Sequence, residues 1–378
     1  MLEKRIYLAS PHLSGKEMIY VKEAFDTNWV APLGKNVDML EKEVASYVNR
    51  KHAAALISGT AAIHLGLKWL GIKEGDFVFC SSLTFSGSCN SIMYEKAIPI
   101  FIDSEYQSWN MDVKALEKAF NWAKKQNKMP KAVITVNLYG QSCDYDRIKA
   151  VCDKYDAPIL EDAAESLGSK YKGIHTGTFG ELSALSFNGN KIITTSGGGM
   201  LLSDDEKAIK KVKFWATQAR DNYPYYHHTE LGYNYRLSNV SAGIGRGQLT
   251  VLDERVKQKK AIYHRYKEAF ADIDDIEMMP VPEWSAPNYW LTTLTLKETS
   301  KVKPMDIIDN LAENNVEARP IWKPMHTQPY YEKYPFFTTK ESGSVAEDIF
   351  NRGLCLPSDT KMTTEEQDYV IGLVKELF

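Results

Sequence analysis

The sequence has no long hydrophobic run, and no stretch of it approaches the roughly 20 apolar residues that a membrane-spanning helix needs. Residues 1–5 continue directly into mixed polar sequence, so we expect no secretion signal. Neither sign of charge is in excess, because 46 Lys and Arg stand against 49 Asp and Glu, for a net charge of −3. These absences argue against nucleic-acid and membrane binding and predict a cytoplasmic protein.

Cysteine is scarce as well. The five cysteines are odd in number and contain no C-x-x-C pair, so we expect neither a disulfide framework nor a metal site. A dinucleotide-binding fingerprint is also missing, since Gly243, Gly245 and Gly247 lie in a helical pattern and do not follow a strand. A nicotinamide-dependent oxidoreductase is therefore disfavoured, although it stays an alternative.

The composition is that of a globular protein with an ample core. The chain has 378 residues, of which 44% are hydrophobic and 25% are charged. This length favours two domains, which we place at residues 1–250 and 251–378.

Short apolar runs alternate with helically spaced segments between about residues 50 and 205. We expect strands at 77–79, 98–102, 132–136 and 159–160, and helices at 112–128 and 145–155. This alternation predicts an α/β fold, whose large domain has a mostly parallel central sheet covered by helices. Ligands of such sheets bind beyond the carboxyl ends of the strands.

The C-terminal third has a different pattern, which predicts a small α+β domain. A long helix from Ser238 would connect the two domains. We expect strands at 290–296 and 316–322, a helix at 305–314, and a last helix that begins with the capping box Thr363-x-x-Glu366.

Lys191 is the residue that points most directly to a chemistry. It follows the apolar run 182–187 and is itself followed by Ile192 and Ile193. A lysine in apolar surroundings tends to lose its proton, and the neutral amine can form a Schiff base with an aldehyde. Enzymes that use pyridoxal phosphate (PLP) hold their cofactor in this way.

Other features upstream fit the same cofactor. Asp162 ends an apolar strand together with Glu161, and a carboxylate there can pair with the pyridine nitrogen. The turn Ser58-Gly59-Thr60-Ala61 opens a helix, whose free N–H groups suit a phosphate. The ring of Phe85 can stack on a flat cofactor, and the hydroxyl of Ser186 can reach the phosphate.

With these motifs the chain resembles, over essentially its whole length, the fold-type I PLP-dependent aminotransferases of the nucleotide-sugar group, the DegT/DnrJ/EryC/StrS family. The resemblance extends to residues 28–34, 232–238 and 317–326. Residues 161–166 and 188–200 resemble one subgroup most. Its members aminate carbon 4 of a UDP-linked 4-keto-6-deoxy-N-acetylglucosamine, on routes to bacillosamine-type sugars and exopolysaccharide.

The resemblance implies a role for each matching position. It makes Lys191 the Schiff-base lysine and Asp162 the partner of the pyridine nitrogen, and it places Phe85 and Ala164 on the two faces of the cofactor ring. Glu165 stands where many relatives carry histidine or glutamine, next to the ring oxygen. The implied phosphate and cofactor contacts within one subunit are Gly59, Thr60, Ala61, Ser186 and Asn190. The resemblance also implies a homodimer, in which Asn234 of each subunit contacts the phosphate bound by the other.

The resemblance also implies the substrates, with glutamate as the amino donor and a UDP-4-keto-6-deoxy sugar as the acceptor. The residues expected to bind the sugar nucleotide are Asn28, Trp29, His228, Tyr233, Arg319 and His326. Amination at C3, a dTDP-linked substrate and a non-catalytic binding protein on the same fold stay alternatives. A sugar dehydratase is discounted, because that chemistry goes with a histidine at the position of Lys191.

Overall fold

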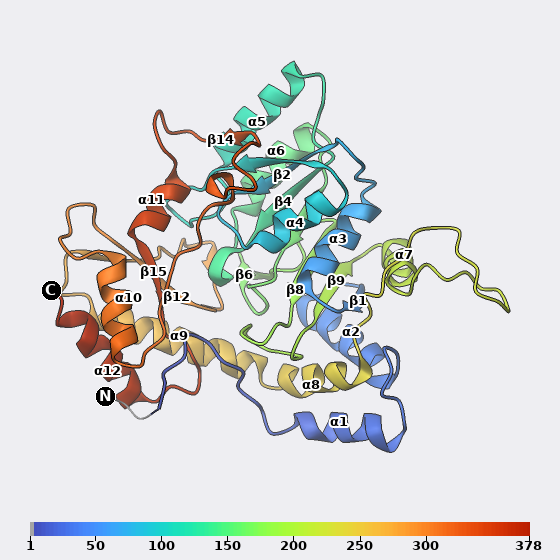
Figure 1. The fold of residues 1–378 in the computed structure, drawn as a ribbon, viewed down its shortest axis with the longest axis horizontal. Helices are drawn as coiled ribbons and strands as arrows, with labels where there is room; N and C mark the ends of the chain where they lie inside the picture. The colour runs from blue at the N-terminus through green and yellow to red at the C-terminus, as the bar shows by residue number, and fades with distance from the viewer. Residues whose placement is uncertain (1–3) are drawn as a thin grey trace.

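The computed structural model describes residues 4–378 (Figure 1). Residues 1–3 of the polar N-terminal segment, where we expect no secretion signal, lie outside the described residues. Within residues 4–378, none of the helices combines the length and the apolar character needed to cross a membrane. The cytoplasmic location stays a prediction.

An eight-stranded sheet forms the centre of the molecule, in the order β1-β9-β8-β5-β4-β2-β3-β14. Neighbours from β14 to β8 pair in parallel, whereas β9 runs antiparallel to both β8 and β1, which confirms the mostly parallel sheet. Its strands are β1 (His52–Leu56), β2 (Phe77–Ser81), β3 (Ile98–Ile102), β4 (Ala132–Val136), β5 (Ile159–Asp162), β8 (Leu182–Ser186), β9 (Gly199–Ser203) and β14 (Phe336–Phe337).

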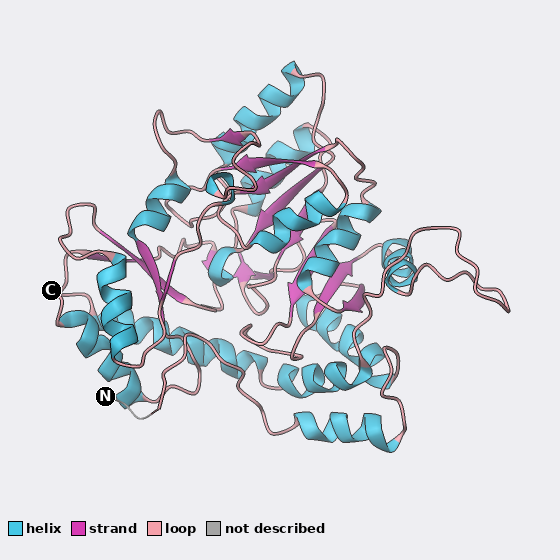
Figure 2. Cartoon of the chain, in the orientation of Figure 1, coloured by secondary structure: helices cyan, strands magenta, loops and turns pink. Residues whose placement is uncertain are grey.

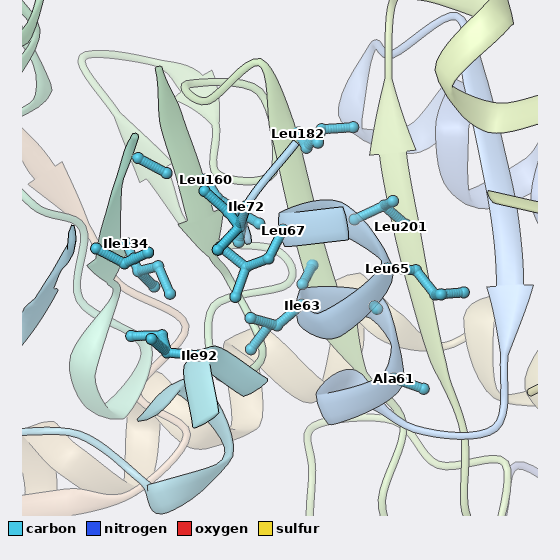
Figure 3. Close-up of a cluster of buried hydrophobic side chains, with 14 of the residues drawn as sticks. Ala61, Ile63, Leu65, Leu67, Ile72, Ile92, Ile134, Leu160, Leu182 and Leu201 are labelled. Carbon is cyan, nitrogen blue, oxygen red and sulfur yellow. The ribbon is translucent and has the colours of Figure 1, made fainter. Parts of the chain in front are cut away.

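Helices pack around this sheet (Figure 2). Figure 3 shows Ile63 and Leu67 of α3 among Leu160 and Leu201 of the sheet, in a cluster of buried side chains. A Cβ at Gly66 would lie 2.7 Å from Leu160 Cδ1, so this glycine lets α3 approach β5 closely. The helices of this part are α1 (Glu17–Asp26), α2 (Lys35–Val48), α3 (Gly59–Trp69), α4 (Ser86–Tyr94), α5 (Val113–Lys125), the short η1 (Leu138–Gly140), α6 (Tyr145–Lys154), α7 (Glu206–Ala216) and α8 (Asn239–Leu249).

A smaller antiparallel sheet, in the order β10-β12-β15-β13, lies in the C-terminal third with a separate hydrophobic cluster. The strand expected at 316–322 is reduced to two residues, because only Arg319 and Pro320 pair with β15. The remaining elements are α9 (Leu252–Ala269), β10 (Ile276–Met278), β12 (Thr292–Leu296), α10 (Pro304–Glu313), β13 (Arg319–Pro320), η2 (Met325–Thr327), α11 (Val345–Arg352), β15 (Gly353–Leu356), α12 (Thr364–Lys375) and a third sheet of β6 (Lys170–Tyr171), β7 (Ile174–His175) and β11 (Ser285–Ala286).

The division into domains at residue 250 stays a prediction. The C-terminal third is not structurally separate from the rest of the chain, because its strand β14 pairs with β3 of the large sheet. Met325 and Tyr331 likewise belong to the hydrophobic cluster between α3 and the large sheet.

The long helix expected from Ser238 is wrong as a continuous element, because it is broken between α8 and α9. At the break, the Thr250 hydroxyl donates to the Gly247 carbonyl at 2.7 Å, a local bond that competes with regular helix. The glycines of α8 serve helix packing, since a Cβ at Gly247 would lie 2.7 Å from the Glu17 backbone of α1.

Candidate active site

A cavity of about 510 Å³ lies where β5 and β8 end, at the carboxyl edge of the parallel sheet. This is the edge at which open α/β sheets bind their ligands. The structure brings ten of the residues predicted from the sequence into the wall of this cavity. They are Gly59, Thr60, Phe85, Asp162, Ala164, Glu165, Ser186, Asn190, Lys191 and Arg319.

The two acids that end β5 have different surroundings. Glu161 is fully buried and accepts hydrogen bonds from the Asn137 side chain, the Ser183 hydroxyl and two backbone N–H groups, at 2.8–2.9 Å. Asp162 points to the other face of the strand and lines the cavity. Its carboxylate therefore is the one available to a ligand, whereas that of Glu161 is used by the fold.

Asp162 is held by two donors. The Ser88 hydroxyl donates to Oδ2 at 2.6 Å, and the Ala164 N–H donates to Oδ1 at 3.1 Å. Burial raises the pKa of Asp162, and these hydrogen bonds together with Lys191 oppose that rise. The donors hold the carboxylate in one orientation and favour its ionised form.

Lys191 faces one carboxylate and one aromatic ring. Its Nζ lies 3.8 Å from Glu165 Oε1 and 3.8 Å from the centroid of the Trp290 ring. Burial lowers the pKa of Lys191, while Glu165 and Asp162 act in the opposite direction. The amine thus loses its proton more readily than that of an exposed lysine, which makes it a better nucleophile and base.

Glu165 is a carboxyl group that can be neutral or ionised near neutral pH. Burial raises its pKa to about 7, against the effect of Lys191 and of the Tyr139 N–H, which donates to Oε2 at 2.6 Å. A carboxyl group with such a pKa can exchange a proton with its neighbours at neutral pH.

The start of α3 forms another part of the cavity wall, where free backbone N–H groups can bind an anion. Ser58 caps this helix, since its Oγ accepts from the Ala61 N–H at 3.0 Å. A Cβ at Gly59 would lie 3.1 Å from Ser186 Cβ, so the glycine leaves room beside the hydroxyl of Ser186. A helix N-terminus with adjacent hydroxyl groups binds phosphate well.

Comparison with known proteins agrees with this geometry. The family model of the DegT/DnrJ/EryC1/StrS aminotransferases matches residues 11–375. The chain belongs to this family. It is 54% identical over 377 residues to EpsN of Bacillus subtilis (strain 168), whose name describes a pyridoxal phosphate-dependent aminotransferase, and the alignment covers 100% of this chain and 97% of EpsN.

Two further similarities support the assignment. The chain is 35% identical over 376 residues to the GDP-perosamine synthase of Escherichia coli O157:H7, with 99% of each chain covered. A crystal structure of a family aminotransferase from Brucella abortus matches with a TM-score of 0.88 at 26% identity, over 96% of this chain and 95% of that one. The protein is therefore a PLP-dependent sugar aminotransferase.

The cavity of this aminotransferase fits PLP in size and in chemistry. Its volume of about 510 Å³ is typical of a cofactor site. The anion site at Gly59 and Ser186 suits the phosphate, the Asp162 carboxylate suits a pyridinium nitrogen, and Lys191 suits the aldehyde. Phe85, whose side chain is 59% exposed and leans on Trp322 with ring centroids 5.6 Å apart, offers an aromatic face to a flat ring.

Seven predicted site residues do not line this cavity. Ala61 lies in the first turn of α3 and its N–H is used by Ser58. Asn28 and Trp29 are exposed beside α1, whereas His228 and Asn234 line a separate hollow of about 850 Å³. The ring of Tyr233 packs against His64 and Tyr235.

His326 lies outside the wall of this cavity, and its contact with a sugar nucleotide stays a prediction. Its ring stacks on Phe336 with centroids 3.6 Å apart, and its Nδ1 lies 2.6 Å from Ser82 Oγ. The ring thus connects η2, to which His326 belongs, with β14 and with Ser82, which follows β2 in the large sheet. These contacts hold the ring in place.

Several cavity residues have no clear signal in the sequence. Ser88 lies one turn after Phe85, which is a hint only once Phe85 is placed. Trp290, Trp322 and Glu317 reach the cavity from the C-terminal third through tertiary packing. Glu317 and Trp322 belong to the matched segment 317–326, but no site role for them is predicted from it.

Proposed function

We propose that this aminotransferase transfers an amino group from glutamate to C4 of a UDP-linked 4-keto-6-deoxy-N-acetylhexosamine. The product would be a UDP-2-acetamido-4-amino-2,4,6-trideoxyhexose, used in the synthesis of a polysaccharide. The observation that carries the transfer is the convergence of Lys191, Asp162 and an anion site in one cavity. The choice of acceptor is supported by residues 161–166 and 188–200, which resemble the C4-aminating subgroup.

The cofactor would be held by residues of the cavity wall and its rim. Asp162 would bind the ring nitrogen, and Phe85 and Ala164 would contact the two ring faces. Glu165 and Asn190 would lie near Lys191 at the reacting end. The phosphate would be bound by Gly59, Thr60 and Ser186, and by Ala61 once its N–H exchanges Ser58 for the phosphate.

PLP supplies an electron sink that acidifies the proton on the reacting carbon and carries the amino group between the two substrates. Lys191 would hold the cofactor between turnovers, and its amine would take a proton from the reacting carbon of the donor and deliver one to the reacting carbon of the acceptor. Burial lowers the pKa of Lys191 and so favours the neutral amine that this task needs. Asp162, held by Ser88, would stabilise the positive charge on the ring in its ionised form.

We infer that the working unit is a homodimer with shared active sites. Helix α1 exposes Met18, Ile19 and Phe25 to the extent of 68%, 65% and 63%, an apolar surface that a second copy would cover. In this arrangement Asn234 would reach the phosphate in the partner's cavity. The sugar nucleotide would contact Asn28, Trp29, His228, Tyr233, Arg319 and His326.

A GDP-linked keto-sugar is the second candidate acceptor. It is favoured by the similarity, at 35% identity, to a protein named GDP-perosamine synthase. The two acceptors differ in the base and in the N-acetyl group, so a direct assay separates them.

The visible absorbance of the PLP-loaded protein tests the proposal. We expect glutamate to bleach the band and UDP-4-keto-6-deoxy-N-acetylglucosamine to restore it. If only a GDP-linked 4-keto-6-deoxyhexose restores the band, the acceptor is GDP-linked and the UDP-linked proposal is wrong. A band that glutamate does not change would reject glutamate as donor.

A further inference from the structure

The charges lining the Lys191 cavity are unevenly distributed. Among residues 4–378, the charged side chains in its wall are the carboxylates Asp162, Glu165 and Glu317 and the cations Lys191 and Arg319. The amine of Lys191 is committed to the reacting group. Arg319 is therefore the cation of this wall that is left to attract an anionic substrate.

An anion-binding side chain is needed for both substrates of the reaction. Glutamate carries two carboxylates, and a nucleotide sugar carries a diphosphate. Without a cation, three carboxylates in the wall would repel either of them. A guanidinium group suits both ligands, because its planar fork binds carboxylates and phosphates through two parallel hydrogen bonds.

The present partner of Arg319 is itself a carboxylate. Arg319 Nη2 donates to Glu317 Oε1 at 2.7 Å, two residues away on the same side of an extended segment. The Arg319 side chain is 63% exposed and that of Glu317 is 20% exposed. The guanidinium group thus keeps most of its donors open while one contact is taken by a glutamate side chain.

Glu317 is fixed independently of Arg319. The Leu8 N–H donates to its other oxygen, Oε2, at 3.2 Å. This bond holds the Glu317 carboxylate in place when Arg319 changes partner, so the exchange requires movement of the arginine side chain alone.

We propose that Arg319 binds a carboxylate of the amino donor and that Glu317 occupies this site until the donor displaces it. The inference rests on the proposed function, since it assigns the contact for the donor of that reaction. After the keto acid leaves, the same guanidinium group is free for the diphosphate of the acceptor. The two anionic substrates therefore bind to the same cation one after the other.

A competition of this kind makes opposite predictions for the two partners. Arg319→Gln removes the cation and weakens binding of a dicarboxylate. Glu317→Gln removes the internal competitor, while its amide oxygen still accepts from Leu8, and so it strengthens binding. Lys323→Gln is the matched control, because Lys323 is an exposed cation of the same segment outside the cavity wall.

Calorimetric titration of the PLP-loaded enzyme with glutarate tests the site without any turnover, because glutarate has two carboxylates and no amino group. We expect Arg319→Gln to raise the Kd by about tenfold and Glu317→Gln to lower it by about threefold, as fits charge-assisted bonds at an open site. We expect Arg319→Lys to recover part of the affinity and Lys323→Gln to leave the Kd unchanged. Circular dichroism confirms that each variant is folded.

Two results would overturn the inference: a Kd for Arg319→Gln equal to that of the parent enzyme, or no saturable binding of glutarate by the parent enzyme. The proposed function is judged separately, from the effect of glutamate on the visible band. If the enzyme binds glutarate through Arg319 but glutamate does not bleach its visible band, the carboxylate site is supported and glutamate is rejected as the donor.

Discussion

Lys259 is a buried lysine and Lys191 is a largely buried one, and they differ in what surrounds the amine. Lys259 lies on α9, and its Nζ donates to the carbonyls of Trp290 at 3.0 Å and Ser358 at 2.5 Å. Lys191 instead faces the Glu165 carboxylate and the Trp290 ring at the wall of a cavity. Burial lowers the pKa of both amines, that of Lys259 to about 8.

Burial and a lowered pKa are therefore insufficient to identify the reactive lysine. Fixed carbonyl acceptors and close packing hold Lys259 in the fold. The Lys191 amine has no fixed carbonyl acceptor among its contacts with Glu165 and Trp290, and it can move into the adjacent cavity. Trp290 joins the two regions, because its carbonyl accepts from Lys259 and its ring lies against Lys191.

Replacing Lys191 gives the largest effect on activity. We expect Lys191→Ala to lower the rate of amino transfer by at least about 10³-fold, because it removes the proton-transfer group and the attachment of the cofactor. The variant should stay folded, since Glu165, whose pKa is about 7, can take up a proton when its partner is lost. Single-turnover kinetics and thermal unfolding measure the two quantities, and normal activity in the variant would contradict the assigned role.

Asp162→Asn should give the second largest loss of activity. The substitution keeps the shape of the side chain but removes the charge that stabilises the pyridinium ring, so we expect turnover to fall on the order of 10²-fold and PLP to dissociate faster. Dialysis against buffer without cofactor, followed by absorbance, measures retention. Ser88→Ala is the graded comparison, because it removes one donor to Asp162 and should have a smaller effect of the same kind.

The fold was predictable where local pattern and burial agree. The parallel strands are short apolar runs, and the last helix begins at the capping box of Thr363 and Glu366, as expected. The break between α8 and α9 was not predictable from periodicity, because apolar residues keep helical spacing on both sides of Thr250.

The candidate site was predictable where its residues are close in sequence to strand ends. Asp162 and Ser186 end β5 and β8, so parallel topology alone brings them together. Glu317 and Trp290 come from the other end of the chain, and no local pattern indicates their contact with the cavity. His326 shows the reverse case, a motif residue whose ring is packed on Phe336 outside the cavity wall.

Lys259→Met tests the structural side of the comparison. The variant leaves the carbonyls of Trp290 and Ser358 without their donor, so we expect the free energy of unfolding to fall by about 1–3 kcal/mol. Activity should be retained better than in Lys191→Ala. Urea unfolding measures the change, and Lys260→Met, an exposed neighbour on the same helix, is the control.

The difference in free energy of unfolding between the parent protein and Lys259→Met should grow as pH rises. The pKa of Lys259 is about 8 in the folded protein, whereas an unfolded lysine titrates near about 10.4. Between these values the unfolded chain binds the extra proton, so the parent protein gains stability as pH rises and the methionine variant does not share this gain. A deficit that is equal at pH 7 and pH 10 would contradict a buried amine with a lowered pKa.

Glu165→Gln should produce the smallest change, a shift in the pH dependence of cofactor attachment. The Glu165 carboxylate raises the pKa of Lys191, against the effect of burial. Its removal leaves burial less opposed, so the Lys191 amine becomes neutral at lower pH. We expect the rate at which PLP-free protein regains its visible band to reach half its maximum about one pH unit lower than in the parent.

The matched control for this shift is Glu347→Gln, whose carboxylate faces His326 at 3.5 Å and lies outside the Lys191 cavity. That variant should keep the pH midpoint of the parent. A profile of Glu165→Gln that coincides with the parent would show that the Glu165 charge does not act on Lys191. A midpoint that moves to higher pH would reverse the sign, and would mean that Glu165 is neutral beside Lys191 and favours its uncharged amine.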